Sequence, residues 1–236
     1  LVILEIDTPG GLDASMRVII KSIQRSMVPV VSYVSPAGSR AASAGTFITI
    51  ASHFAAMAPG TNIGAAHPVS LMGGSESEKK SPMEDKILND AAAYIRSLAE
   101  MRGRNEHWAE MAVRQSVAIS AEEAKRLAVI DLVANDMDAL LLGIHGRKLK
   151  IGEKDITLKT QGLLVDYREM SKRQKILDII SNPNVVYVLM IIGIVGLYLE
   201  LSNPGLIFPG VLGGISLILA LYSMQTLPVN YAGLLL

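Results

Sequence analysis

Short apolar runs alternate with helical segments over the first 58 residues, and this alternation constrains the fold more than any other feature of the sequence. Residues 1–6, 30–34 and 54–58 are apolar runs of strand length. Between them, residues 13–27 carry apolar side chains at helical spacing, and residues 43–51 are small or apolar. Strands that alternate with helices form a mostly parallel sheet covered on both faces. The sequence therefore predicts an α/β fold with a mostly parallel sheet and flanking helices.

Two segments of small residues follow strands of this predicted sheet. The first strand runs into Asp7-Thr8-Pro9-Gly10-Gly11, and Ser43 begins the second helix within Ala41-Ala42-Ser43-Ala44-Gly45. A glycine turn leaves its N–H groups uncovered, and a helix N-terminus offers free N–H groups at the positive end of its dipole. A serine beside such groups is suited to act as a nucleophile next to an oxyanion hole. The alternative interpretation is that Ser43 is a structural helix cap.

A nucleophilic serine needs a base, and Lys86 is one candidate. It lies early in a helix predicted from Pro82 to about Arg102, after the polar segment 72–80. An amine acts as a base only when it is neutral, so its pKa must fall through burial or nearby positive potential. Lys86 lies off the apolar stripe of its helix, so the residues alone favour a solvated surface lysine. Lys79 and Lys80 are poorer candidates because they lie in the polar segment.

His67 is the alternative base. It follows a predicted strand and turn, where its side chain could reach a cleft. Imidazole titrates near neutrality without a large pKa shift, but a catalytic histidine usually needs a carboxylate to orient it. A hydrogen-bonded structural histidine is the competing interpretation.

The character of the chain changes after Leu142. Residues 145–160 are basic and alternating, as in a small β-hairpin, and residues 165–180 have the spacing of an amphipathic helix. Two uncharged apolar runs follow at residues 185–199 and 207–222. Each is shorter than the roughly 20 residues that span a bilayer, but their succession favours membrane helices over a buried hairpin. A third run begins at Tyr231.

These patterns divide the chain into residues 1–142, 143–183 and 184–236. The first segment is the predicted catalytic domain, the second a β-hairpin with an amphipathic linker, and the third a truncated set of membrane helices. The 236-residue chain starts and stops inside apolar runs, so we expect it to be a fragment.

Composition excludes several classes of function. The formal net charge is zero, which gives no indication of a nucleic-acid partner. The absence of cysteine excludes thiolate catalysis and zinc–cysteine sites. The sequence has neither a phosphate-binding loop nor a cluster of metal ligands, so we expect no metal and no cofactor.

Several motifs in order resemble one known family, the membrane-bound serine proteases of the NfeD family. A more distant resemblance connects them to Clp protease and signal peptide peptidase A, which share the ClpP/crotonase fold. The resemblance covers most of residues 1–145 and continues into the membrane region. It depends on the segments 7–11, 41–45, 58–61 with 63–65, and 123–125 with 130–131.

The resemblance implies a Ser–Lys dyad. Ser43 matches the family's nucleophile, and Lys86 matches its lysine because both precede a Tyr-Ile-x-Ser-Leu-Ala stretch. Gly10 and Ala44 match the positions whose N–H groups hold the oxyanion, and Gly11 supports that turn. His67 falls near the position of the Clp histidine, but the position of the Clp aspartate is Ser116, so that triad lacks its carboxylate.

The resemblance also implies partners. It predicts a membrane-anchored endopeptidase that cleaves hydrophobic peptide segments, including those of a stomatin-like membrane protein. The fold commonly forms homo-oligomers. The family usually exports its protease domain, whereas the basic flank of Lys172, Arg173 and Lys175 favours a cytoplasmic domain by the positive-inside tendency. We expect a multi-pass membrane protein with an extracytoplasmic protease domain. The alternatives are a non-catalytic scaffold that binds stomatin-like partners and a crotonase-like acyl-CoA enzyme.

Overall fold

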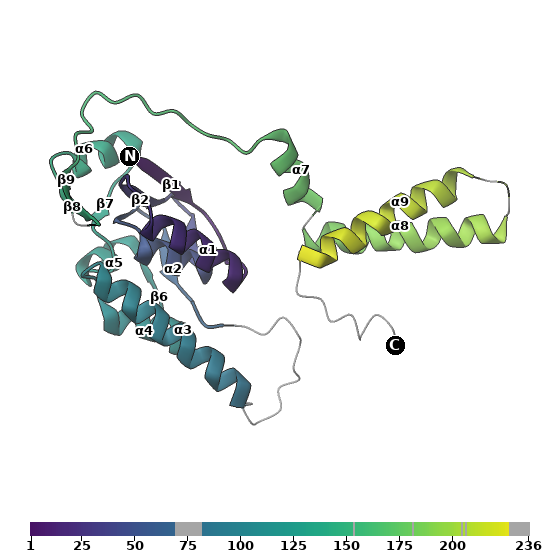
Figure 1. Ribbon diagram of the computed structural model, residues 1–236, viewed down its shortest axis with the longest axis horizontal. Helices are drawn as coiled ribbons and strands as arrows, with labels where there is room; N and C mark the ends of the chain where they lie inside the picture. The colour runs from purple at the N-terminus through teal and green to yellow at the C-terminus, as the bar shows by residue number, and fades with distance from the viewer. Residues whose placement is uncertain (69–81, 153, 181, 204, 206, 227–236) are drawn as a thin grey trace. The chain divides into compact units, whose positions relative to one another are not determined.

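The chain divides into two compact units, of which one reaches Leu164 and the other begins at Val165 (Figure 1). The computed structural model describes residues 1–68, 82–152, 154–180, 182–203, 205 and 207–226. The polar segment 72–80 therefore lies outside the described residues, as does the apolar run that begins at Tyr231.

A four-stranded parallel sheet forms the centre of the first unit. Its order is β1-β2-β4-β7, and every neighbouring pair is parallel. The predicted α/β fold with a parallel sheet is confirmed. The strands are β1 (Val2–Ile6), β2 (Val30–Val34), β4 (Phe54–Met57) and β7 (Leu132–Val133).

A second, three-stranded sheet adjoins the end of the first, and the sequence patterns did not predict it. Its strands are β3 (Arg40–Ala42), β5 (Asn62–Gly64) and β6 (Ala118–Ser120), and β5 pairs in parallel with β3 and antiparallel with β6. Thr8 forms a parallel bridge with Ala41, so the segment after β1 continues beside β3. Strands of three residues are too short to show a period in sequence.

Six helices of the first unit are described. α1 ends three residues before the predicted Met27, because the Ser26 hydroxyl bonds to Val28 in a turn that leads into β2. The helices α4 and α6 were not predicted; their N-caps are the side chains of Asn105 and Asp136. The helices are α1 (Asp13–Gln24), α2 (Ala44–Ala51), α3 (Pro82–Met101), α4 (Glu106–Arg114), α5 (Ala121–Arg126) and α6 (Met137–Ile144).

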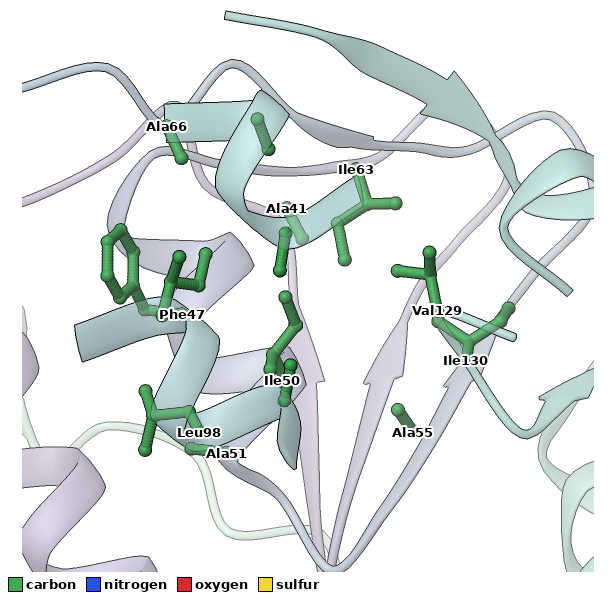
Figure 2. Close-up of a cluster of buried hydrophobic side chains, with 14 of the residues drawn as sticks. Ala41, Phe47, Ile50, Ala51, Ala55, Ile63, Ala66, Leu98, Val129 and Ile130 are labelled. Atoms are coloured by element: carbon green, nitrogen blue, oxygen red, sulfur yellow. The ribbon is translucent and has the colours of Figure 1, made fainter. Parts of the chain in front are cut away.

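Two hydrophobic clusters cover the two faces of the parallel sheet. The larger contains Phe47 and Ile50 of α2, Leu98 of α3 and Ile63 of β5, all buried (Figure 2). The smaller joins β2 and β4 to α6 and the hairpin after it. Because α2 is buried on nearly every side, its position and that of the residue before it are set by the core.

The predicted basic hairpin is present as β8 (Lys148–Ile151) and β9 (Lys154–Thr157), which pair antiparallel. The predicted amphipathic helix begins later than expected, as α7 (Lys172–Ile180), and residues 165–171 have no regular structure.

Two apolar helices follow, α8 (Pro183–Ser202) and α9 (Phe208–Thr226). Among the described residues, one helix is long and apolar enough to cross a membrane, over Asn184–Ser202. The apolar part of α9, Phe208–Met224, is shorter.

Candidate active site

Ser43 occupies a strained position at the start of α2. Its φ of 51° and ψ of −116° lie outside the regions that side chains usually adopt, and its N–H donates to the Gly64 carbonyl of β5 at 3.1 Å. Its side chain is half-buried, and no hydrogen bond between described residues uses its hydroxyl. Strain of this kind persists only where surrounding structure imposes it, and it is typical of functional sites.

Gly10 lies directly against Ser43. A Cβ atom built on Gly10 would stand 2.9 Å from the Ser43 Cβ and 3.3 Å from its Oγ, and the φ of Gly10 is +146°. Only glycine tolerates both the close approach and the backbone angle. The structure therefore brings the two predicted segments, residues 7–11 and 41–45, into contact.

The N–H groups around Ser43 differ in their availability. The Gly10 N–H, expected to bind the oxyanion, donates instead to the Thr8 hydroxyl at 3.1 Å. No hydrogen bond between described residues uses the N–H of Gly11 or of Ala44. A Cβ built on Gly11 would lie 3.8 Å from the Ala44 Cβ, so the two segments that carry these free donors are neighbours.

Thr8 and Thr46 hold this arrangement together, and sequence reasoning missed both. The Thr8 hydroxyl also donates to the Gly10 carbonyl at 2.9 Å. Thr46, fully buried in α2, places its hydroxyl 2.9 Å from the Ala41 carbonyl and 2.8 Å from that of Gly64. Each threonine lies within three residues of a candidate site residue. This proximity was the only indication in the sequence that either threonine belongs to the site.

Lys86 lies in the first turns of α3 with an exposed side chain. Among the described residues, no hydrogen bond or ion pair links it to Ser43. Asp90, one turn further along, pairs with Arg17 of α1 at 2.5 Å, and Tyr94, two turns further along, stacks against Phe47 of α2. Residues four apart share a helix face, so Lys86 lies on the face of α3 that contacts α1 and α2, one turn before the α1 contact and two turns before the α2 contact.

His67 is half-buried after β5, and its Nδ1 lies 2.9 Å from the Val113 carbonyl of α4. A carbonyl oxygen only accepts, so Nδ1 carries a proton and donates to it. The partner that orients this imidazole is thus a backbone carbonyl, where a Ser–His–Asp triad would use a carboxylate. No hydrogen bond between described residues joins His67 to Ser43.

Within the described residues, no group of three or more His, Asp or Glu side chains is placed to hold a metal ion.

The geometry defines a class of protein: an α/β fold in which a strained serine meets a glycine turn at the start of a buried helix. Sequence comparison then places the chain in a family. The profile of the NfeD1b N-terminal domain matches residues 1–142, and that of the NfeD integral membrane domain matches residues 184–236. The chain belongs to the NfeD family and carries its membrane domain.

Two curated relatives extend this finding. The chain is 40% identical over its whole length to membrane-bound protease PH1510 of Pyrococcus horikoshii, and it covers 53% of that protein. It is 28% identical over 94% of its length to membrane protein NfeD1b of Bacillus subtilis, of which it covers 48%. The chain therefore spans about half the length of the curated relatives it matches.

Solved structures of the Pyrococcus horikoshii protease domain, 1510-N, share the fold. A lysine-to-alanine variant in complex with a substrate peptide is 39% identical, covers 74% of this chain and 80% of its own, and superposes with a TM-score of 0.67. A serine-to-alanine variant is 40% identical, covers 72% of this chain and 82% of its own, and superposes with a TM-score of 0.67. That protease is described as membrane-bound and specific for a stomatin homolog.

Proposed function

We propose that this chain is the catalytic and membrane-anchoring part of a serine endopeptidase that uses a Ser43–Lys86 dyad. The observation that carries the proposal is the strained Ser43 between a glycine turn and a helix N-terminus, with two backbone N–H groups unused by any described residue. This combination supplies a nucleophile and a preorganised site for negative charge, which acyl transfer requires.

The spacing of the dyad supports Lys86 as the base. In the Pyrococcus horikoshii protease, the serine and the lysine replaced in the solved variants stand 41 positions apart. Ser43 and Lys86 stand 43 positions apart, whereas Lys79 and Lys80 follow Ser43 by 36 and 37 positions. Loops between elements readily gain or lose two residues.

The mechanism follows from these positions. Neutral Lys86 accepts the Ser43 proton as Oγ attacks the peptide carbonyl, and the protonated amine then donates to the leaving nitrogen. The Ala44 N–H and an N–H of the Gly10–Gly11 turn hold the oxyanion, with Gly11 better placed because Thr8 already binds the Gly10 N–H. Water then hydrolyses the acyl-enzyme. Lys86 is exposed in the free chain, so we propose that bound peptide covers and desolvates it.

The substrate class comes from the relatives. The Pyrococcus horikoshii protease was solved with a substrate peptide and is specific for a stomatin homolog. We propose that this chain likewise cleaves hydrophobic segments of a stomatin-like membrane protein. An extracytoplasmic protease domain, a multi-pass membrane segment and a homo-oligomer belong to the same proposal.

A serine-directed fluorophosphonate tests the nucleophile on the full chain in detergent. We expect labelling of the wild type and of Ser22→Ala, an exposed serine on α1, and none of Ser43→Ala. Absent labelling in the wild type, with a stomatin-like partner still bound, would instead identify a scaffold. Binding of coenzyme A without labelling would indicate the acyl-CoA enzyme.

Peptide cleavage separates the two bases. Lys86→Ala should lower kcat by about 10²–10⁴-fold, and Lys86→Arg should not rescue it because a guanidinium stays charged. Lys21→Ala, another exposed lysine, should leave the rate unchanged, and His67→Ala should keep most of it. Loss of cleavage in His67→Ala together with full activity in Lys86→Ala would assign the base to His67.

A further inference from the structure

The overall neutrality of the chain hides a separation of charge along it. Residues 1–144 contain 13 basic residues (Lys and Arg) and 16 acidic residues (Asp and Glu). Residues 145–183 contain nine basic and five acidic residues. The 53 residues after them contain a single acid, Glu200. The catalytic segment is therefore acidic, and the segment between the two family-matched regions is basic, with a net charge of +4.

The β8–β9 hairpin presents part of this positive charge on one face. Lys148 and Lys150 alternate with Leu149 and Ile151, so the lysines point away from the face that carries the apolar residues. Ile151 is buried, and Leu149 packs against the smaller core cluster beside α6. The core therefore fixes which face of the hairpin meets solvent, and that face is cationic.

These cations have no partners in the described part of the chain. No ion pair between described residues involves Lys148 or Lys150, although Asp155 is the cross-strand neighbour of Lys150. The adjacent Arg147 and Lys159 are also exposed and form no ion pair with a described residue. A surface whose charges are not neutralised within the molecule is suited to bind an anionic partner.

The candidate membrane span identifies the partner. Asn184 begins the span 27 residues after Thr157, so an extended connector of at most about 3.3–3.6 Å per residue keeps the hairpin within reach of the bilayer surface. Lys172 and Arg173, which are exposed and form no ion pair with a described residue, add positive charge next to that span. Tethering raises the effective concentration of lipid headgroups far above that of any soluble acidic partner.

We propose that the cationic face of the β8–β9 hairpin, formed by Lys148 and Lys150, binds anionic phospholipid headgroups. Basic side chains near an anionic leaflet each contribute favourably to binding, within about a Debye length of the surface. Because residues 1–144 are acidic, the same leaflet repels the rest of the unit, so the hairpin becomes the face turned to the membrane. The inference does not depend on the proposed catalysis.

Energy transfer to the bilayer tests this orientation on the full chain. The chain has no cysteine, so Leu142→Cys, a 73% exposed site on α6, takes one donor fluorophore. The labelled chain is reconstituted into phosphatidylcholine vesicles with or without about 30 mol% phosphatidylglycerol, each with an acceptor lipid. We expect greater transfer with the anionic lipid, and a return to the neutral level at about 1 M salt, where the Debye length is about 3 Å.

A matched pair of variants assigns the effect. Lys148→Gln/Lys150→Gln should weaken binding of the hairpin to anionic vesicles about 30-fold, about fivefold per lysine. Energy transfer in this variant should no longer depend on the lipid composition. Lys21→Gln/Arg25→Gln removes two exposed charges from α1 and the residue after it and should behave as wild type. Equal transfer on both vesicles in the wild type would overturn the proposal. The proposal would also be overturned if the hairpin variant changed energy transfer equally on neutral and anionic vesicles. In that case the lysines would bind acidic residues of the protein instead of lipid headgroups.

Discussion

At the scale of single residues, Thr8 connects the two halves of the site. Its hydroxyl contacts both the N–H and the carbonyl of Gly10, and its backbone pairs with Ala41 just before Ser43. Its methyl group fills the space over Gly45, where an added Cβ would lie 2.7 Å from the Thr8 Cγ2. The hydroxyl and the methyl group therefore have separable roles, one in orienting the glycine turn and one in packing α2.

Two substitutions at Thr8 separate these roles. Thr8→Val keeps the shape but frees the Gly10 peptide, so we expect kcat to fall by about tenfold or more, up to the roughly 10²–10³-fold that loss of an oxyanion donor costs. Thr8→Ser keeps the hydroxyl and should retain activity within about threefold, with a lower Tm from the lost methyl contact. Peptide cleavage and thermal unfolding measure the two effects. Retained cleavage in Thr8→Val together with lost cleavage in Thr8→Ser would show that packing against Gly45 is what the site requires.

His53 makes the stability of the first unit depend on pH. Burial, together with the nearby Arg102 and Arg104, lowers the pKa of His53 from 6.5 to about 4, so the imidazole stays neutral in the folded chain and Nδ1 accepts the Val30 N–H at 3.2 Å. The unfolded chain binds a proton near pH 6.5. Stability from this group is therefore complete above pH 6.5 and is lost as pH falls toward 4.

We expect about 1–2 kcal/mol of destabilisation between pH 7 and pH 4.5 from His53, after allowing for solvent screening of a half-buried group. Trp108, the only tryptophan and fully buried, reports unfolding of this unit by its fluorescence in urea. His53→Asn should flatten the pH dependence, whereas His107→Asn, at an exposed site on α4, should not. Parallel pH profiles for wild type and His53→Asn would contradict the assignment.

At the scale of elements, glycines allow α8 and α9 to touch. A Cβ on Gly196 would lie 2.5 Å from the Pro209 carbonyl and 2.8 Å from the Gly213 Cα. Small residues let helix backbones approach closely where lipid gives no hydrophobic drive for association. The pairing of the two apolar helices therefore depends on a few positions without side chains.

Gly196→Ala should separate this helix pair at a cost of about 1–3 kcal/mol. Spin labels at Tyr187→Cys on α8 and Tyr222→Cys on α9, both exposed, measure their separation by double electron–electron resonance in a bilayer. We expect a broader or longer distance distribution in Gly196→Ala. Gly214→Ala, where an added Cβ meets nothing within 4 Å, serves as the control and should match the wild type.

At the scale of the whole molecule, the boundary between the two units lies in an exposed connector. One unit ends at Leu164, which is 98% exposed, and residues 165–171 have no regular structure. Exposed segments without backbone pairing are preferred sites of proteolysis.

Trypsin should therefore cleave after Arg168, whose side chain is 88% exposed, while the first unit remains folded. Mass spectrometry identifies the cut, and the urea midpoint read from Trp108 should not change after it. Cleavage at Lys21 in α1, or at Arg25 directly after it, before any cut in the connector would contradict this division of the chain.

Sequence patterns predicted the elements whose signals are local. β1, β2 and β4 are apolar runs of four or five residues, the hairpin alternates, and Ser43 begins a helix of small residues. β3, β5 and β6 were missed because three residues carry no period, yet they hold the site together. Gly64 illustrates the point, since a Cβ there would stand 2.2 Å from the Val117 carbonyl of a segment more than 50 residues away.

The sequence by itself determined the class of fold, the candidate nucleophile, the basic segment and the apolar helices, because each follows from residue spacing within a short window. Only the tertiary structure decided that Ser43 is strained, that Thr8 takes the Gly10 N–H, and that Gly11 and Ala44 keep theirs free. Ser43 is held by contacts with Gly10 and Gly64, far from it in the chain, and the local Thr8–Gly10 bond lies in a segment that pairs with Arg40 and Ala42 through backbone hydrogen bonds. The directions of these bonds and contacts are set when the segments meet, and no local pattern records them.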